Sequence, residues 1–169
     1  MLPSQLCKAN TEYAHQCALM SYIAVAHQHG FEVARQWASQ SIAMPKMPEY
    51  PAVPSLQWFH AIHNQGHGDR IRGSRAKAAG VRKGVADLFL PYPVAGRHGL
   101  YIELKIPSKR PKADGVGGVS EAQSEFGRFA LSNGYAWSVA YGWEDAADIV
   151  EKYLKMRVIR GEISGQYDV

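Results

Sequence analysis

The sequence predicts an α/β fold in which a small mixed β-sheet is flanked by α-helices. Segments with helical spacing or helix-start signals alternate with short apolar runs of strand length. Glycine and proline clusters separate these segments, as expected for turns and connectors. The predicted order is helix, helix, strand, helix, strand, strand, helix, strand, helix. The 169 residues fit one domain with a core over about 11–155; residues 156–169 form a tail with no clear signal.

The composition is typical of a globular protein, with 46% hydrophobic and 20% charged residues. The formal net charge is +4 and the isoelectric point is about 9.1, which is compatible with a nucleic-acid partner. Cys7 and Cys17 lie in a segment of helical character and predict neither a disulfide framework nor a zinc site. Because there is no signal-peptide pattern and no apolar run near 18 residues, we expect a soluble cytoplasmic protein without a membrane partner.

Two helices are predicted in the first part of the chain. Asn10 or Thr11 can cap the first, which ends at about His29 before Gly30. Four of its residues recur at helical spacing and are expected to face the core: Tyr13, Cys17, Met20 and Ala24.

The second helix is expected from Phe31 to about Ile42. Residues 44–54 contain four prolines, which exclude a helix and favour an extended connector. Residues 56–62 are apolar and aromatic enough for a strand, and 64–68 form a polar loop.

A short basic helix is predicted at 69–79, ending at Gly80. A positive cluster runs along it and beyond it, and these residues are candidates for nucleic-acid binding: Arg70, Arg72, Arg75, Lys77, Arg82 and Lys83. Such a local concentration of positive charge favours phosphate binding more strongly than the modest overall charge does. The simpler alternative is a solvated helix face.

Two apolar runs, 84–90 and 99–105, each contain charged residues. The turn residues between them predict an antiparallel hairpin that holds Asp87, Glu103 and Lys105 close together. Glu103 and Lys105 are two residues apart, so a strand points them to the same face. Two acids and a lysine on one face can bind a divalent cation and steady a phosphate. Alternatively, Asp87 caps a turn, and Glu103 and Lys105 form an exposed edge pair.

The remaining elements are a loop, a helix, a strand and a last helix. The loop at 108–118 carries Lys109 and Arg110, which join the nucleic-acid-binding candidates. Ser120 and Gln123 match a capping box, so a helix should run from there to about Ser132. A strand is expected at 135–141, and a helix should begin at 144 or 145 and reach about 155.

Several ordered phrases carry a family resemblance. They are Glu12-x-x-x-Gln16, residues 61–66, residues 80–87, residues 98–105, residues 120–123 and Gly142-Trp143. In this order they resemble the catalytic core of the PD-(D/E)XK nucleases, and more closely the VRR-NUC branch in its small standalone form found in phages and bacteria. Ala86 and His63 stand where this branch usually has proline; neither change removes a charged group, so we expect altered geometry rather than lost chemistry.

The resemblance implies a restriction-endonuclease-like core and a metal-dependent DNA endonuclease, structure-selective in the manner of Holliday-junction resolvases or for other branched DNA. It implies Mg²⁺ or Mn²⁺ as cofactor, held by Asp87, Glu103 and the carbonyl of Leu104, with Glu12 as a further acidic ligand. Lys105 would orient or activate water or stabilise phosphate charge, and Gln123 would help to position them. It also implies a homodimer in a bacterial or phage-infected cytoplasm, with no small-molecule cofactor.

Other interpretations remain open at the level of sequence. Glu12 can be an ordinary first-turn acid, and Gln123 can serve its capping box alone. The whole chain can be a binding module that kept the fold and lost catalysis. An enzyme acting on a small phosphorylated metabolite lacks the expected Gly-rich loop. His60, His63 and His67 suggest a zinc cluster, although a single strand would send His60 and His63 to opposite faces.

Overall fold

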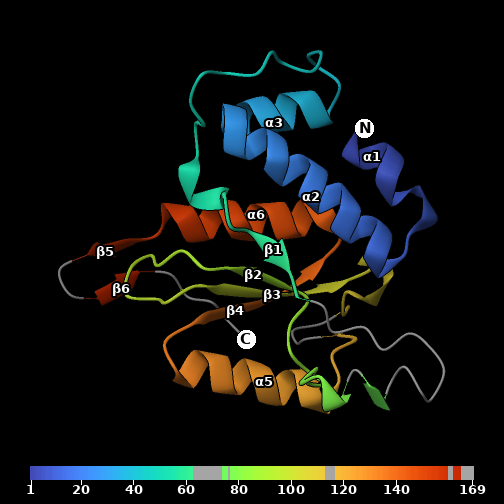
Figure 1. Ribbon diagram of the computed structural model, residues 1–169, viewed down its shortest axis with the longest axis vertical. Coiled ribbons are helices and arrows are strands. Elements are labelled where there is room, and N and C mark those ends of the chain that lie inside the picture. Colours follow the sequence, from blue (N-terminus) through green and yellow to red (C-terminus); the bar gives the residue numbers. More distant parts are fainter. Residues whose placement is uncertain (63–73, 76, 113–116, 160–161, 165–169) are drawn as a thin grey trace.

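A four-stranded mixed sheet lies between helices on both faces (Figure 1). The computed structural model describes residues 1–62, 74–75, 77–112, 117–159 and 162–164, and side chains as far as residue 156. The strands are β1 (His60–Ala61), β2 (Leu88–Leu90), β3 (Leu100–Lys105) and β4 (Ala136–Tyr141), in that spatial order. The pairs β1–β2 and β2–β3 are antiparallel, whereas β3 and β4 are parallel. The predicted mixed sheet and the predicted hairpin are therefore confirmed.

The long helices are α2 (Glu12–His29), α3 (Phe31–Ala38), α5 (Glu121–Ser132) and α6 (Trp143–Lys155). In Figure 1, α2 and α6 lie on one face of the sheet, with α3 packed against α2, and α5 covers the other face. The predicted caps form: the Thr11 hydroxyl accepts a hydrogen bond from the Ala14 amide at 3.1 Å, and Ser120 caps α5. The helix α3 ends four residues before the predicted Ile42.

Short elements differ more from prediction. The first ten residues contain α1 (Pro3–Leu6) and the 3₁₀ turn η1 (Cys7–Ala9). The predicted strand at 56–62 is reduced to β1, because Pro54 opens a 3₁₀ turn, η2 (Pro54–Leu56), where a strand would begin.

The C-terminal segment, which gave no sequence signal, contains an antiparallel pair of strands, β5 (Arg157–Ile159) and β6 (Glu162–Ser164). The predicted loop 64–68 and much of the predicted basic helix lie outside the described residues; within that helix, 74–75 and 77–78 are helical.

The prediction that Tyr13, Cys17, Met20 and Ala24 form the buried face of α2 is wrong. Tyr13 is 67% exposed, Ala24 is exposed, and Cys17 and Met20 are only half-buried. The buried positions of α2 are Ala14, His15, Ala18, Leu19, Tyr22, Ile23, Val25 and Ala26. Because α2 contacts α1, α3, α6 and β3, its buried surface is wider than one stripe, and alanine lets the neighbouring elements approach closely.

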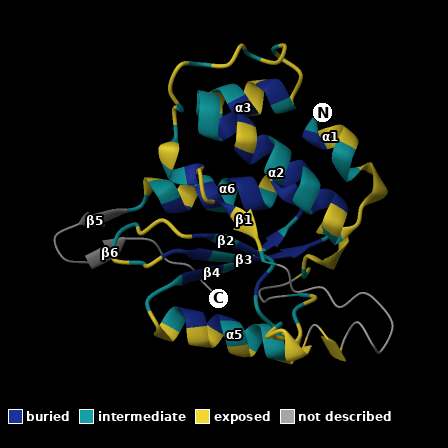
Figure 2. Cartoon of the chain, in the orientation of Figure 1, coloured by how far each residue is buried: buried dark blue, intermediate teal, exposed yellow. Residues whose placement is uncertain are grey.

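The strand β3 is covered on both faces (Figure 2). Leu100, Ile102 and Leu104 enter the main core with residues of α2 and α6. The alternate residues face α5, where Tyr101 packs on a second cluster that includes Ala86, Ala130 and Trp137. Glu103 and Lys105 follow Tyr101 on this face, so the alternation of the strand places two charges in the interior. No helix among the described residues is long and apolar enough to cross a membrane.

Candidate active site at the end of strand β3

Asp87 lies directly before β2 and forms hydrogen bonds with the chain on both sides of that strand. Its carbonyl oxygen accepts a hydrogen bond from the Ile62 amide at 2.7 Å, just beyond β1. Its side-chain Oδ2 accepts a hydrogen bond from the Leu104 amide of β3 at 2.9 Å. The carboxylate therefore reaches across to β3, which is more than the capping of its own turn.

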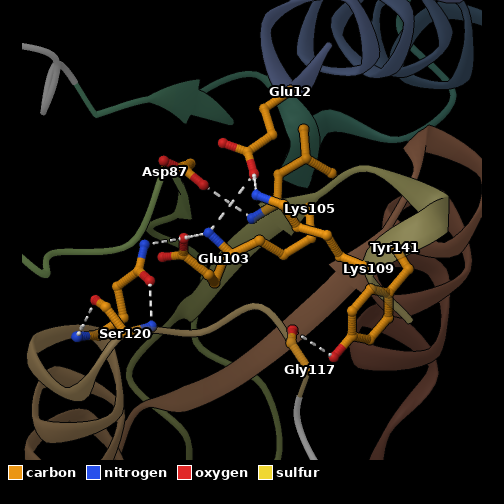
Figure 3. A network of polar contacts seen from close by, with 10 residues as sticks. Glu12, Asp87, Glu103, Lys105, Lys109, Gly117, Ser120 and Tyr141 are labelled. Atoms are coloured by element: carbon orange, nitrogen blue, oxygen red, sulfur yellow. Dashed lines mark hydrogen bonds and ion pairs between the residues drawn. The ribbon is translucent and has the colours of Figure 1, made fainter. Parts of the chain in front are cut away.

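Glu103 and Lys105 form a buried pair on β3 (Figure 3). The ammonium of Lys105 donates a hydrogen bond to Glu103 Oε1 at 2.7 Å. Glu103 is fully buried and Lys105 is 5% exposed, because β3 is an inner strand of the sheet. The alternative of an exposed edge pair is therefore wrong.

Gln123 reaches the same glutamate from the first turn of α5. Its side-chain Oε1 accepts a hydrogen bond from the Ser120 amide at 2.8 Å, which completes the capping box. Its Nε2 donates to Glu103 Oε1. Gln123 thus completes the helix cap and also contacts Glu103. At the level of sequence, the capping role alone was an open alternative.

Glu12 enters from the first turn of α2. Its Oε1 lies 3.8 Å from the ammonium of Lys105 and 3.2 Å from that of Lys109. The structure therefore brings together the five side chains that the sequence nominated. We call this group the acidic site: Glu12, Asp87, Glu103, Lys105 and Gln123 (Figure 3).

The electrostatics of the acidic site follow from its burial. Burial and the neighbouring Asp87 carboxylate raise the pKa of Glu103 to about 8, against the opposing effect of Lys105. Burial also raises the pKa of Asp87, although the Leu104 amide and the Lys105 ammonium act in the other direction. Burial alone would lower the pKa of Lys105, but the three carboxylates, Glu103 first, raise it above its ordinary value. The carboxyl groups are thus crowded into a poorly solvated place that disfavours their ionised forms, and a bound cation would favour those forms again.

The residues fit a hard divalent cation. Glu103 Oε2 is buried and accepts no hydrogen bond from any described residue, and leaving such an oxygen unpaired is costly. Within the described part of the chain, no three His, Cys, Asp or Glu side chains form a group that could hold a metal ion. Asp87 and Glu103 would therefore need further oxygens, from water or from a carbonyl such as that of Leu104, which suits Mg²⁺ or Mn²⁺.

The basic residues separate into two groups. Arg75, Lys77, Arg82 and Lys83 are exposed, whereas Arg70 and Arg72 lie outside the described residues. Lys109 and Arg110 contact the protein itself: Lys109 pairs with Glu12, and Arg110 pairs with Asp145 at 2.8 Å.

Of the three histidines that suggested zinc, only His60 is described. Its Nδ1 lies 2.7 Å from the carbonyl oxygen of Trp58, and its ring meets that of Phe89 edge-on. His63 and His67 lie outside the described residues.

The sequence did not nominate Tyr141 or His15. The hydroxyl of Tyr141 donates to the Gly117 carbonyl at 3.1 Å. Tyr141 is paired in register with Lys105, and the shared carboxyl end of two parallel strands was the signal that could have found it. His15 is buried, and its Nδ1 accepts a hydrogen bond from the Trp143 amide at the start of α6, at 3.3 Å. That contact joins residues 128 positions apart, so no local sequence pattern predicts it.

Comparison with known proteins supports the fold. No protein-family model matches the sequence, and no curated protein matches it. A solved structure described as a VRR_NUC domain protein is similar with a TM-score of 0.51 and 23% identity, over 80% of this chain and 92% of that one. The chain therefore has the fold of a VRR_NUC domain protein, as its motifs predict.

Proposed function

We propose that this protein is a nuclease that hydrolyses phosphodiester bonds in DNA with the help of Mg²⁺ or Mn²⁺. The single observation that carries the proposal is the buried Oε2 of Glu103, which accepts no hydrogen bond from the described residues, although the Asp87 carboxyl, Lys105 and Gln123 all meet the same glutamate. The solved VRR_NUC domain protein of the same fold supports it.

Each residue of the acidic site has a role in this proposal. Asp87 and Glu103 would hold the cation, with the Leu104 carbonyl as a further oxygen and Glu12 as an outer acidic ligand. A cation held there would supply Lewis-acid chemistry, polarising the scissile phosphate and lowering the pKa of a water molecule. Lys105, a buried hydrogen-bond donor beside Glu103, orients that water or stabilises charge on the phosphate oxygens. Gln123 fixes the glutamate from α5.

The DNA backbone would lie along the exposed basic residues. Arg75, Lys77, Arg82 and Lys83 precede Asp87 in the chain, are exposed, and form no ion pair with another described residue, so they can neutralise phosphates. We further propose a branched substrate and a homodimer, in which two acidic sites act on two strands. A monomer mass in sedimentation at working concentration would contradict the dimer.

The test is cleavage of plasmid and branched DNA with Mg²⁺ or Mn²⁺, with a chelator as the control. Asp87→Asn, Glu103→Gln and Lys105→Met should each reduce cleavage by about a hundredfold or more, because each removes a charge from the reacting centre. Glu121→Gln is the matched control, since this exposed acid on α5 pairs with Arg128 at the surface and with no other described residue. Circular dichroism verifies that each variant is folded.

Two results would contradict the proposal. If all three variants cleave as well as the parent, the acidic site is not the catalytic centre. If the folded parent binds DNA but never cuts it under any metal condition, the chain is the alternative, a binding module with the same fold.

A further inference from the structure

Lys109 holds a position that phosphate binding alone does not explain. It ends the 3₁₀ turn η3 (Pro107–Lys109), which follows β3. Its ammonium donates to Glu12 Oε1 at 3.2 Å, and the same oxygen faces Lys105. Glu12 therefore lies between two ammonium groups, and the half-exposed Lys109 side chain points toward the acidic site (Figure 3).

Two glycines shape the path of the Lys109 side chain. A Cβ at Gly118 would lie 2.9 Å from Lys109 Cδ and 3.1 Å from its Cβ, and Gly118 has a φ of +72°. A Cβ at Gly117 would overlap the Lys109 carbonyl oxygen. The stem of Lys109 thus lies against a backbone that only glycine permits at this distance.

The same loop is anchored to the sheet on its other side. Tyr141 of β4 donates its hydroxyl hydrogen to the Gly117 carbonyl at 3.1 Å. The guanidinium of Arg110 lies 5.0 Å from the centre of the Tyr141 ring and pairs with Asp145 of α6. These contacts hold the backbone on both sides of Lys109, and this backbone position directs the Lys109 ammonium toward Glu12.

The two lysines of this centre differ in how firmly they are held. The Lys105 side chain is 6% exposed and its partner Glu103 1%. The Lys109 side chain is 46% exposed and that of Glu12 38%. Half-exposed ion pairs contribute little to stability, so the Glu12–Lys109 pair can be exchanged, whereas the buried pair cannot.

We propose that Lys109 is a displaceable counterion of the metal centre. It neutralises Glu12 when no metal is bound. A cation held by Asp87 and Glu103 would attract Glu12 as an outer ligand, and the Lys109 ammonium would then be free to pair with a phosphate oxygen of the DNA. The inference deepens the proposed nuclease function and rests on it. In the absence of DNA, Lys109 would compete with the metal for Glu12. When DNA is bound, Lys109 would assist cleavage.

The first experiment measures Mn²⁺ binding by calorimetry, without DNA. Lys109→Gln should lower the dissociation constant of Mn²⁺ about two- to fivefold, since the competing ammonium is gone. Lys112→Gln is the matched control, because it removes the same charge from an exposed position of the same loop and should leave the constant unchanged. Lys109→Arg keeps the charge and should bind Mn²⁺ as the parent does.

The second experiment is a double-mutant cycle with Glu12→Gln. In that background Lys109→Gln should no longer tighten Mn²⁺ binding, because its partner carboxylate is absent. At saturating Mn²⁺, single-turnover cleavage by Lys109→Gln should be slower than by the parent or by Lys112→Gln.

The outcomes separate the two proposals. Equal Mn²⁺ binding by Lys109→Gln and Lys112→Gln, or the same tightening with and without Glu12, overturns the counterion role while a cleaving parent keeps the nuclease function. Tighter binding with parental cleavage overturns the transfer to phosphate. A parent that binds no Mn²⁺ overturns the metal-dependent function and the inference together.

Discussion

His15 is a buried side chain that ties the start of α2 to the start of α6. Its Nε2 bonds Asn10 Oδ1 at 3.0 Å, while its Nδ1 accepts from the Trp143 amide. This pair of contacts requires the neutral ring with its hydrogen on Nε2. Since Glu12 lies one turn away on α2, the contact also fixes where the first turn of that helix meets the sheet.

The burial of His15 predicts a pH dependence of stability. Burial lowers the pKa of His15 below its ordinary 6.5, against the weaker effect of Glu144. The unfolded chain therefore binds the proton more tightly than the folded chain does. The contribution of His15 to the free energy of unfolding is complete above about pH 6.5 and is lost as the pH falls through the folded value.

His15→Asn measures that contribution, because asparagine offers an acceptor that does not titrate. The variant should be less stable than the parent at about pH 7.5, and urea denaturation should show the difference shrinking toward about pH 5. A difference that stays constant or grows on acidification would rule out protonation of His15 as its cause.

At the level of elements, the segment before β2 packs closely against the start of α5 at Gly84. Gly84 has a φ of +93°, and a Cβ there would overlap the carbonyl oxygen of Ala122. Ala122 precedes Gln123, and Gly84 lies three residues before Asp87. This close approach therefore helps to set the distance between the Asp87 carboxylate of one element and the Gln123 amide of the other.

Gly84→Ala should destabilise the protein and reduce cleavage together. Gly80→Ala is the control, since Gly80 has the same φ of +93° but no described atom within 4 Å of its Cβ position. Backbone strain alone should cost about 1 kcal/mol in Gly80→Ala, whereas the overlap should add about 1–3 kcal/mol in Gly84→Ala. Thermal unfolding and cleavage rates test this. Equal losses in the two variants would show that the contact with α5 is unimportant.

For the molecule as a whole, the distribution of charge predicts how DNA binding depends on salt. Arg82 and Lys83 are exposed beside the segment that leads to Asp87, whereas Lys46 is exposed in the connector after α3. Figure 1 shows this connector on the outer side of α3, away from the sheet. Phosphate contacts should therefore involve the first pair and not Lys46.

The measurement is the slope of log K against log salt, made with the Glu103→Gln protein so that DNA stays intact. Arg82→Gln and Lys83→Gln should each reduce the size of the slope by about 1, the value for one phosphate contact. Lys46→Gln should leave it unchanged. If all three variants have the parental slope, the DNA follows another path.

The sequence by itself determined the long helices and the inner strands, and the residues that lie next to one another within them. Thr11 and Ser120 begin their helices because a cap acts over three residues. Glu103 and Lys105 share a face because alternation along a strand is a local property. The same locality explains the failure at α2, where Tyr13 fits a helical stripe but its surroundings leave it exposed.

Only the tertiary structure decided what these residues meet. Lys109 contacts Glu12 although the two residues are 97 positions apart in the sequence. Gln123 completes the helix cap that the sequence predicts and also donates a hydrogen bond to Glu103. The burial of Glu103 depends on a parallel neighbour and on helices over both faces of β3. Charge and spacing can be read from the chain, but desolvation and long-range pairing arise from packing. The sequence thus nominated the residues of the acidic site, and the fold determined that Glu103 is buried and that its Oε2 accepts no hydrogen bond from the described residues.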